Sequence, residues 1–166
     1  MKKRMILIFT LALVGIFGGI LLFGVILPGG ASGGNYSKKL TIESGTGRHE
    51  FMVEVADTIT SRARGLSGRA GLTENQGMFF IFGSQDMHGF WMKDMKFPID
   101  IVWIRGEKIV EFAENAAPEP GKSLLSLKVY YPPEPADKVL EIKAGLAEKL
   151  ELKVGDKIIF LNKKEG

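Results

Sequence analysis

The chain has 166 residues, contains no cysteine and carries a formal net charge of +3 at pH 7. The lack of cysteine excludes disulfides, thiolate nucleophiles, zinc–thiolate sites and lipidation at a lipobox cysteine. The surplus charge comes from Lys2, Lys3 and Arg4, because without these three the 22 basic residues fall to 19, equal to the 19 acidic residues. A neutral domain lacks the excess of Lys and Arg that phosphate binding requires, so we expect no nucleic-acid partner.

Residues 5–27 are an apolar run of about 23 residues. At about 1.5 Å per residue, such a helix crosses a hydrocarbon core of about 30 Å. Basic residues precede the run and none lies in residues 28–37, which predicts a cytoplasmic N-terminus. The alternative is a cleaved secretory signal, for which Ala31 and Ser32 offer a weak cleavage site.

These features predict three parts of the chain. Residues 1–27 are expected to form a cytoplasmic basic start and a single-pass transmembrane signal-anchor. Residues 28–37, rich in glycine, are expected to form a flexible tether. Residues 38–166 then form one domain on the non-cytoplasmic side of the cell membrane, since about 130 residues is the usual size of a single domain.

Short strands dominate the predicted domain. The strands are expected, in chain order, at residues 40–44, 50–56, 77–82, 90–93, 99–104, 108–113, 139–143 and 156–162, and short helices at residues 59–66 and 146–150. The first helix follows Thr58, a good N-cap, and has Gly65 near its end. Many short strands with two brief helices predict a mainly β (α+β) fold, a small barrel or sandwich.

Residues 116–137 contain five of the seven prolines and predict a long, stiff excursion with one short strand within residues 125–130. Long loops of this kind often carry function. Tyr130 and Tyr131, followed by two prolines, favour an exposed aromatic surface of the type that interfaces use. A merely rigid loop explains the same pattern equally well.

Residues 90–94 read Phe-Trp-Met-Lys-Asp and residues 98–100 read Pro-Ile-Asp. They resemble the Phe-Trp-Met-Lys-Asn-Thr and Pro-Leu-Asp signature of an uncharacterised prokaryotic family, domain of unknown function 192, also called uncharacterised protein family 0127. Further matches, in the family's order, are Arg64-Gly65-Leu66 with Arg69, Gly77-Met78-Phe79-Phe80, Val139-Leu140-Glu141, Gly145 and Gly155-Asp156.

The resemblance covers roughly residues 49–160. It implies a compact β-rich fold, frequent export or membrane anchoring, and no established activity. This chain departs from the family pattern with Ser67 in place of Met, and with Asp94 and Met95 in place of Asn-Thr.

The signature segment supplies the candidate binding residues. In one interpretation, Trp91 is an aromatic platform, Lys93, Asp94 and Asp100 give polar contacts, and Arg69 completes an anion-tolerant rim. In the other, Trp91 fills the core, Lys93 is solvated and Asp100 bonds a local turn. Strand alternation sets Trp91 and Lys93 on one face, but it does not decide which face is core.

The favoured function is a non-catalytic binding or accessory module of the cell envelope, with an envelope protein or glycan as partner and no cofactor. A membrane tether, a neutral domain and the lack of a recognisable catalytic set motivate this hypothesis.

A second hypothesis is a hydrolase of envelope material that uses carboxylates. Asp100 would be the base and Asp86, Asp94 or Glu141 the acid, because glycosidic chemistry needs two carboxyl groups at a suitable gap.

A third hypothesis is a soft-metal site. Met87, Met92 and Met95 lie close to His88 in the sequence, and thioether and imidazole ligands suit Cu(I). Strand alternation, which turns Met92 and Met95 to opposite faces, counts against it.

Overall fold

The computed structural model describes residues 34–160, and the predicted anchor at residues 5–27 lies outside the described residues. The elements are β1 (Lys38–Ser44), β2 (Gly47–Ala56), α1 (Ile59–Arg64), β3 (Gln76–Asp86), β4 (Phe90–Trp91), β5 (Ile99–Arg105), β6 (Lys108–Ala116), the 3₁₀ turn η1 (Leu124–Ser126), β7 (Val129–Tyr130), β8 (Ala136–Lys143), α2 (Leu146–Lys149) and β9 (Lys157–Phe160). Within residues 34–160, no helix has the length and apolar character needed to cross a membrane.

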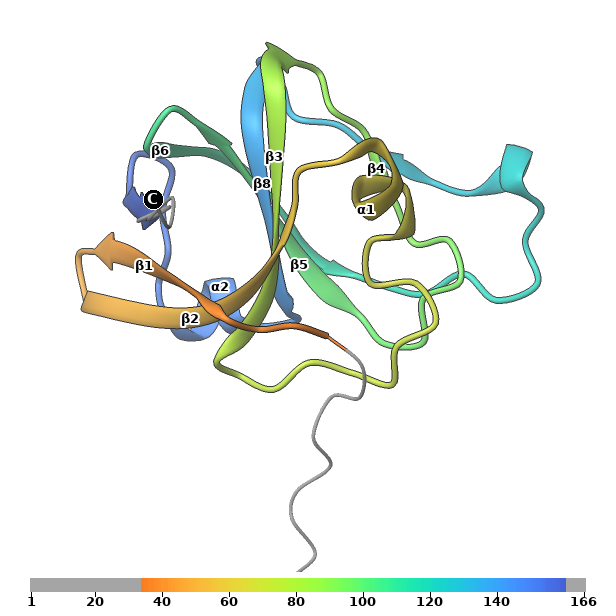
Figure 1. The fold of residues 1–166 in the computed structure, drawn as a ribbon, viewed down its shortest axis with the longest axis horizontal. Helices are drawn as coiled ribbons and strands as arrows, with labels where there is room; N and C mark the ends of the chain where they lie inside the picture. The colour runs from red at the N-terminus through yellow and green to blue at the C-terminus, as the bar shows by residue number, and fades with distance from the viewer. Residues whose placement is uncertain (1–33, 161–166) are drawn as a thin grey trace, which may run out of the picture.

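Seven strands close into a barrel in the order β1-β2-β3-β8-β5-β6-β9, and β9 pairs back with β1. Figure 1 shows this barrel with α1 and β4 beside β3 and β8. The predicted mainly β fold is confirmed, and of the two predicted architectures the barrel is the one observed. Every pairing in it is antiparallel except that of β2 with β3.

The one parallel pair explains where α1 lies. Parallel neighbours need a crossover connection rather than a tight hairpin. Residues 57–75 provide it, and they carry α1 across the outer face of the barrel (Figure 1). A crossover of this kind leaves room between helix and sheet for a second layer of side chains.

The domain therefore has two apolar clusters. One lies inside the barrel and has members from all seven barrel strands, including Phe51, Phe79, Val102 and Leu140. The other lies on the outer face of β3, β5 and β8, beneath the crossover and the signature segment, and includes Met78, Phe80, Leu66, Met92, Ile101, Trp103 and Val139. Residues 139–142 of β8 are buried between the two clusters, and they are apolar with Glu141 as the exception.

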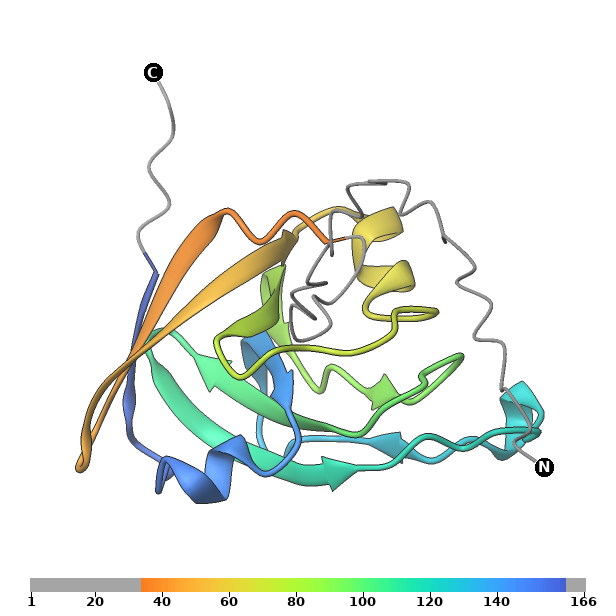
Figure 2. The same cartoon turned by 90° about the horizontal axis from the view of Figure 1, so that it is seen from below.

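The signature segment pairs with the Pro-rich excursion. Strands β4 and β7 form a two-stranded ribbon in which Phe90 lies opposite Tyr130 and Trp91 opposite Val129. A Cβ at Gly89 would lie 2.5 Å from the Tyr131 ring and 2.8 Å from a Val129 methyl group, so a larger residue there would displace these side chains. Figure 2 shows the excursion projecting from the barrel with η1 near its tip. The strand predicted at residues 90–93 is thus real but shorter, and its partner lies within the predicted residues 125–130.

Candidate functional site

A cavity of about 300 Å³ lies on the outer face of the barrel. Its walls come from α1 and the turn after it, from β3, from the segment around β4 and from β8. The lining residues are Arg62, Ala63, Arg64, Gly65, Leu66, Ser67, Phe80, Phe82, His88, Gly89, Phe90, Trp91, Met95 and Glu141. A volume of this size is at the lower end of the range for small-molecule sites.

Local sequence signals position the helical wall. Thr58 accepts a hydrogen bond from the Ser61 backbone N–H, and the Ser61 hydroxyl accepts one from the Thr58 N–H, so α1 begins with a capping box. The helix stops at Arg64, two residues earlier than predicted, because Gly65 adopts a φ of 51°. The chain then turns back, and Leu66 enters the outer cluster.

Two hydrogen bonds tie the turn after α1 to the signature segment. The Ser67 hydroxyl donates to the Lys93 carbonyl oxygen at 2.9 Å, and the Gly68 N–H donates to the Asp94 carbonyl oxygen at 2.9 Å. Asp94 has a φ of 55°, a conformation that Asp and Asn tolerate better than most residues. These two bonds hold the turn after α1 against residues 93–94 and so fix one end of the cavity.

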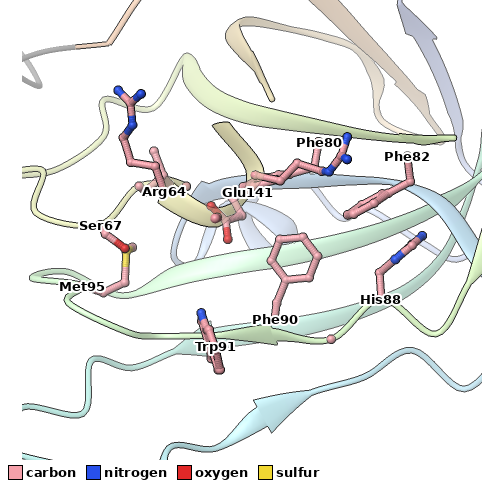
Figure 3. A pocket seen from close by; sticks show the side chains of 14 residues that line it. Arg64, Ser67, Phe80, Phe82, His88, Phe90, Trp91, Met95 and Glu141 are labelled. Atoms are coloured by element: carbon pink, nitrogen blue, oxygen red, sulfur yellow. The ribbon is translucent and has the colours of Figure 1, made fainter. Parts of the chain in front are cut away.

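Glu141 is the buried carboxyl group of the cavity. Its residue is 5% exposed, and within residues 34–160 its Oε2 is the one buried side-chain oxygen or nitrogen without a hydrogen-bond partner. Figure 3 shows the side chain directed into the cavity, with the Phe80 and Phe90 rings on one side of it. Burial raises the pKa of Glu141 from 4.5 to about 8, and the charge of Arg69 partly opposes that rise. At pH 7 the carboxyl group is therefore mostly protonated and neutral.

Strands β3 and β8 approach each other closely beside Glu141. A Cβ at Gly77 of β3 would lie 2.9 Å from the Glu141 carbonyl oxygen and 3.2 Å from a Leu140 methyl group. Only glycine lets β3 and β8 pair this closely at the cavity floor.

Aromatic rings form the rest of the cavity wall. The Phe82 and His88 rings stack with their centroids 3.5 Å apart, and Phe80 meets Phe90 edge-on at 4.9 Å. The Trp103 indole is buried behind them and donates from Nε1 to the His88 carbonyl oxygen at 2.9 Å, which holds the segment before β4 against β5. Trp91 is 49% exposed, so the interpretation in which Trp91 fills the core is wrong. The core face of the signature is the one with Phe90 and the buried Met92.

Arg69 does not reach into the cavity. Its Nη2 donates to Glu54 Oε2 at 2.8 Å and its Nη1 to the Tyr36 hydroxyl at 2.8 Å, and the guanidinium group lies over the Tyr36 ring. The side chain is 8% exposed. The pKa of Arg69 is raised: burial, the largest influence, lowers it, but the bonds to Glu54 and Tyr36 and their charges outweigh burial.

The structure separates the five predicted site residues. Trp91 lines the cavity around Glu141, and Arg69 lies behind it in the Glu54 pair. Lys93 and Asp94 pair with each other and line a second hollow of about 180 Å³ against residues of the Pro-rich excursion. Asp100 is buried and lines neither hollow.

Asp100 is a structural residue. It is fully buried, Oδ1 accepts the Asn115 N–H at 2.8 Å and Oδ2 accepts the Ala147 N–H at 2.9 Å. The predicted hydrogen bond to a turn after Pro98 is thus replaced by bonds to β6 and to α2. Both carboxylate oxygens hold backbone, so Asp100 is not positioned to act as the base of a hydrolase.

The methionines of the metal hypothesis also separate. Met87 is exposed, Met92 is buried in the outer cluster, and only Met95 shares the cavity with His88. Across residues 34–160, no three His, Asp or Glu side chains are grouped so that they could hold a metal ion.

Sequence reasoning named Glu141 only as one possible acid among three and did not predict the cavity. A signal was present, because one glutamate interrupts the apolar run Val-Leu-Glu-Ile on a strand that is covered on both faces. A carboxyl group in such a run must be buried, paired or functional.

Comparisons with known proteins agree with the signature. The family DUF192, described as Uncharacterized ACR, matches residues 40–160. A UPF0127 protein of Pyrococcus abyssi is 29% identical over 126 residues, which cover 72% of this chain and 94% of that protein.

Two crystal structures have the same fold. A protein of unknown function from Novosphingobium aromaticivorans has a TM-score of 0.67 and 34% identity, over 73% of this chain and 83% of that one. A protein of Sinorhizobium meliloti, described as a candidate transcription regulator, has a TM-score of 0.68 and 29% identity, over 76% of this chain and 95% of that one. With its domain matched from β1 to β9, the chain belongs to the DUF192 family of uncharacterised proteins.

Proposed function

We propose that this protein is a membrane-anchored, non-catalytic binding module of the cell envelope whose domain lies outside the cytoplasm. Its ligand, supplied by an envelope component, enters the cavity around Glu141. The observation that carries this proposal is the Glu141 carboxyl group, buried with Oε2 unpartnered, at the floor of an open aromatic cavity. A polar group buried without a partner costs free energy, and a ligand that supplies the partner recovers it.

The anchor part of the proposal comes from the sequence. Residues 5–27 have the length and apolar character of a transmembrane helix, and the basic residues before them favour a cytoplasmic N-terminus. Gly34 is the sixth residue after Pro28, and six steps of at most about 3.5 Å keep the start of the domain within about 20 Å of the bilayer. Such a module would meet ligands at the membrane surface.

Binding is favoured over hydrolysis because Glu141 is the only acidic residue among those that line the cavity. Acid–base cleavage of a glycosidic bond needs a second carboxyl group within about 10 Å on the same cleft. The candidate partner Asp100 is opposite Ile142 on the neighbouring strand, but it faces the other side of the sheet from Glu141 and holds backbone N–H groups there.

Nucleic acid is not part of the proposal, although one relative is described as a candidate transcription regulator. Outside the first four residues the acidic and basic residues balance. Phosphate binding depends on a local surplus of cations.

Acrylamide quenching of tryptophan fluorescence tests the proposal on the full chain. Trp103 is buried, so the quenchable signal reports Trp91 at the cavity. Envelope extracts should protect Trp91 from acrylamide. Ala63→Phe, which adds a ring to the cavity lining on α1, should abolish the protection, whereas Ile59→Phe on the same helix, outside the cavity, should not.

Protection of Trp91 that survives Ala63→Phe would show that the ligand contacts Trp91 outside the cavity. Membrane fractionation with external protease tests the anchor separately. The domain should be cleaved in spheroplasts while residues 1–27 remain with the membrane, and a domain protected from the protease would contradict the orientation.

A further inference from the structure

The charges that line the cavity are not balanced. Arg62 and Arg64 are the cationic residues among the lining, and Glu141, the one acidic residue, is mostly neutral at pH 7. The other charged side chain that acts on Glu141 is Arg69, which is also cationic. The potential at the cavity is thus positive, which favours an anion over a cation.

The two arginine side chains of the cavity differ in how many hydrogen bonds they already make within the protein. Arg62 donates from Nη1 to the Asp57 and Ile81 carbonyl oxygens and lies over the Phe82 ring, so it is part of the wall. Arg64 is exposed, and its side chain makes no hydrogen bond or ion pair with other residues in the range 34–160, although its carbonyl oxygen accepts the Ser67 N–H. Figure 3 shows its guanidinium group turned away from Glu141, and an exposed arginine can rotate to meet a ligand at the cavity mouth.

The lining also specifies an apolar body. Phe80, Phe82 and Phe90 form one wall, Trp91 stands half-exposed at the opening, and Met95 adds a flexible thioether. Rings of this kind hold aromatic or branched aliphatic groups through area burial and edge-to-face contacts. A highly hydrated, compact anion would gain nothing from them.

We infer that the cavity binds a small organic carboxylate with an apolar or aromatic body. One oxygen of the ligand accepts a hydrogen bond from the Glu141 carboxyl group, and Arg64 pairs with the ligand's negative charge. The ring or chain of the ligand packs against the phenylalanines. This inference rests on the proposed function, because it names the ligand class of the same cavity.

The hydrogen bond imposes a pH dependence. The titratable and charged groups around Glu141 are Arg62 and Arg64 from α1, Arg69 from the loop after it with its partner Glu54 of β2, and His88 before β4. On the flanking strands, its register partners are Met78 of β3 and Ile101 of β5, which carry no charge. The donor to the ligand is the O–H of the protonated Glu141 carboxyl group, and ionisation of that group removes it. Binding therefore weakens about tenfold per pH unit above about 8.

Three probes of one size test the inference: benzoate, benzyl alcohol and benzylamine, titrated into the full chain by calorimetry and by chemical-shift changes of the Trp91 indole N–H. We expect benzoate to bind at least about tenfold more tightly than benzyl alcohol at pH 6.5, because charge-assisted hydrogen bonds are the stronger ones. Benzylamine should bind most weakly.

Two variants isolate the groups. Glu141→Gln keeps an N–H donor at all pH values, so the variant should bind benzoate with the same affinity at pH 9.5 as at pH 6.5. The wild type should bind benzoate at least about tenfold more weakly at pH 9.5 than at pH 6.5. Arg64→Gln should weaken benzoate about threefold to fivefold and leave benzyl alcohol unchanged. The matched control is Arg48→Gln on the distant β1–β2 hairpin, which should change neither.

The outcomes separate the two claims. Benzylamine bound in the cavity most tightly, with affinity that rises with pH, would overturn the carboxylate class and leave the cavity as the binding site. Benzoate binding that ignores both pH and Arg64→Gln would also overturn the class. No shift of the Trp91 indole with any probe would count against the inference and the proposed function together. Competition of benzoate by the low-molecular-mass filtrate of envelope extracts indicates a free carboxylate, and competition by the retained fraction alone indicates an attached one.

Discussion

Arg69 acts on Glu141 through its charge but gives its hydrogen bonds to Glu54 and Tyr36. The cation whose charge acts on Glu141 is thus committed elsewhere, and Glu141 is left without an ion-pair partner. Burial then dominates and holds the carboxyl group neutral near pH 7. The candidate site depends on this division of partners.

The first prediction concerns stability against pH. The folded pKa of Glu141, about 8, exceeds its ordinary value of 4.5, so the folded state keeps a proton that the unfolded state releases between these pH values. The free energy of unfolding should therefore fall as pH rises from about 4.5 to about 8, by up to about 5 kcal/mol if the cavity stays dry. Urea denaturation at pH 5 and pH 8 measures this fall, and Glu141→Gln should remove most of it. An equal pH dependence in the variant would assign the fall to other groups.

The second prediction concerns Asp100. Asp100→Asn replaces one of two acceptor oxygens by an amide NH₂, so either the Asn115 or the Ala147 N–H loses its partner. We expect a loss of about 2 kcal/mol or more, because charge-assisted bonds to buried backbone are affected. The matched control is Asp94→Asn, exposed and at a φ of 55° that asparagine accepts, which should cost less than about 0.5 kcal/mol. Similar effects of the two changes in chemical denaturation would contradict the structural role of Asp100.

The third prediction concerns Arg69. Arg69→Met leaves Glu54 and Tyr36 without their donor and should destabilise the fold by about 2–3 kcal/mol. It also removes the charge that lowers the pKa of Glu141, so that pKa should rise above about 8. Arg48→Gln, which breaks the exposed pair with Glu43, should change stability by less than about 0.5 kcal/mol and leave Glu141 alone. Thermal denaturation and carboxyl NMR give the two readouts, and an unchanged Glu141 pKa in Arg69→Met would show that the charges do not interact.

The fourth prediction compares the two tryptophans. Trp91→Ala should cost less than about 1 kcal/mol, because half of the side chain is already in solvent. Trp103→Ala should cost about 3–5 kcal/mol, since it empties a buried site and frees the His88 carbonyl oxygen. Denaturant titration distinguishes them. Comparable losses would mean that Trp91 is a core residue after all.

Local patterns predicted most strands, both short helices and the mainly β fold, because alternation and turn residues act over a few positions. They could not predict that β2 and β3 pair in parallel, a relationship between residues separated by a crossover. That crossover carries α1, which forms one wall of the cavity. For the same reason Asp100, near the signature in sequence, lies with α2, and Glu141, far from the signature, shares a cavity with Trp91.

The central claim is that Glu141 is a neutral carboxylic acid at the floor of a ligand cavity. A carbon-13 NMR titration of the Glu141 side-chain carboxyl tests it most directly, with Glu141→Gln used to assign the signal. The account predicts a midpoint near pH 8 that moves upward when benzoate is bound, because a second negative charge disfavours ionisation. A midpoint near the ordinary 4.5, unmoved by benzoate, would contradict it.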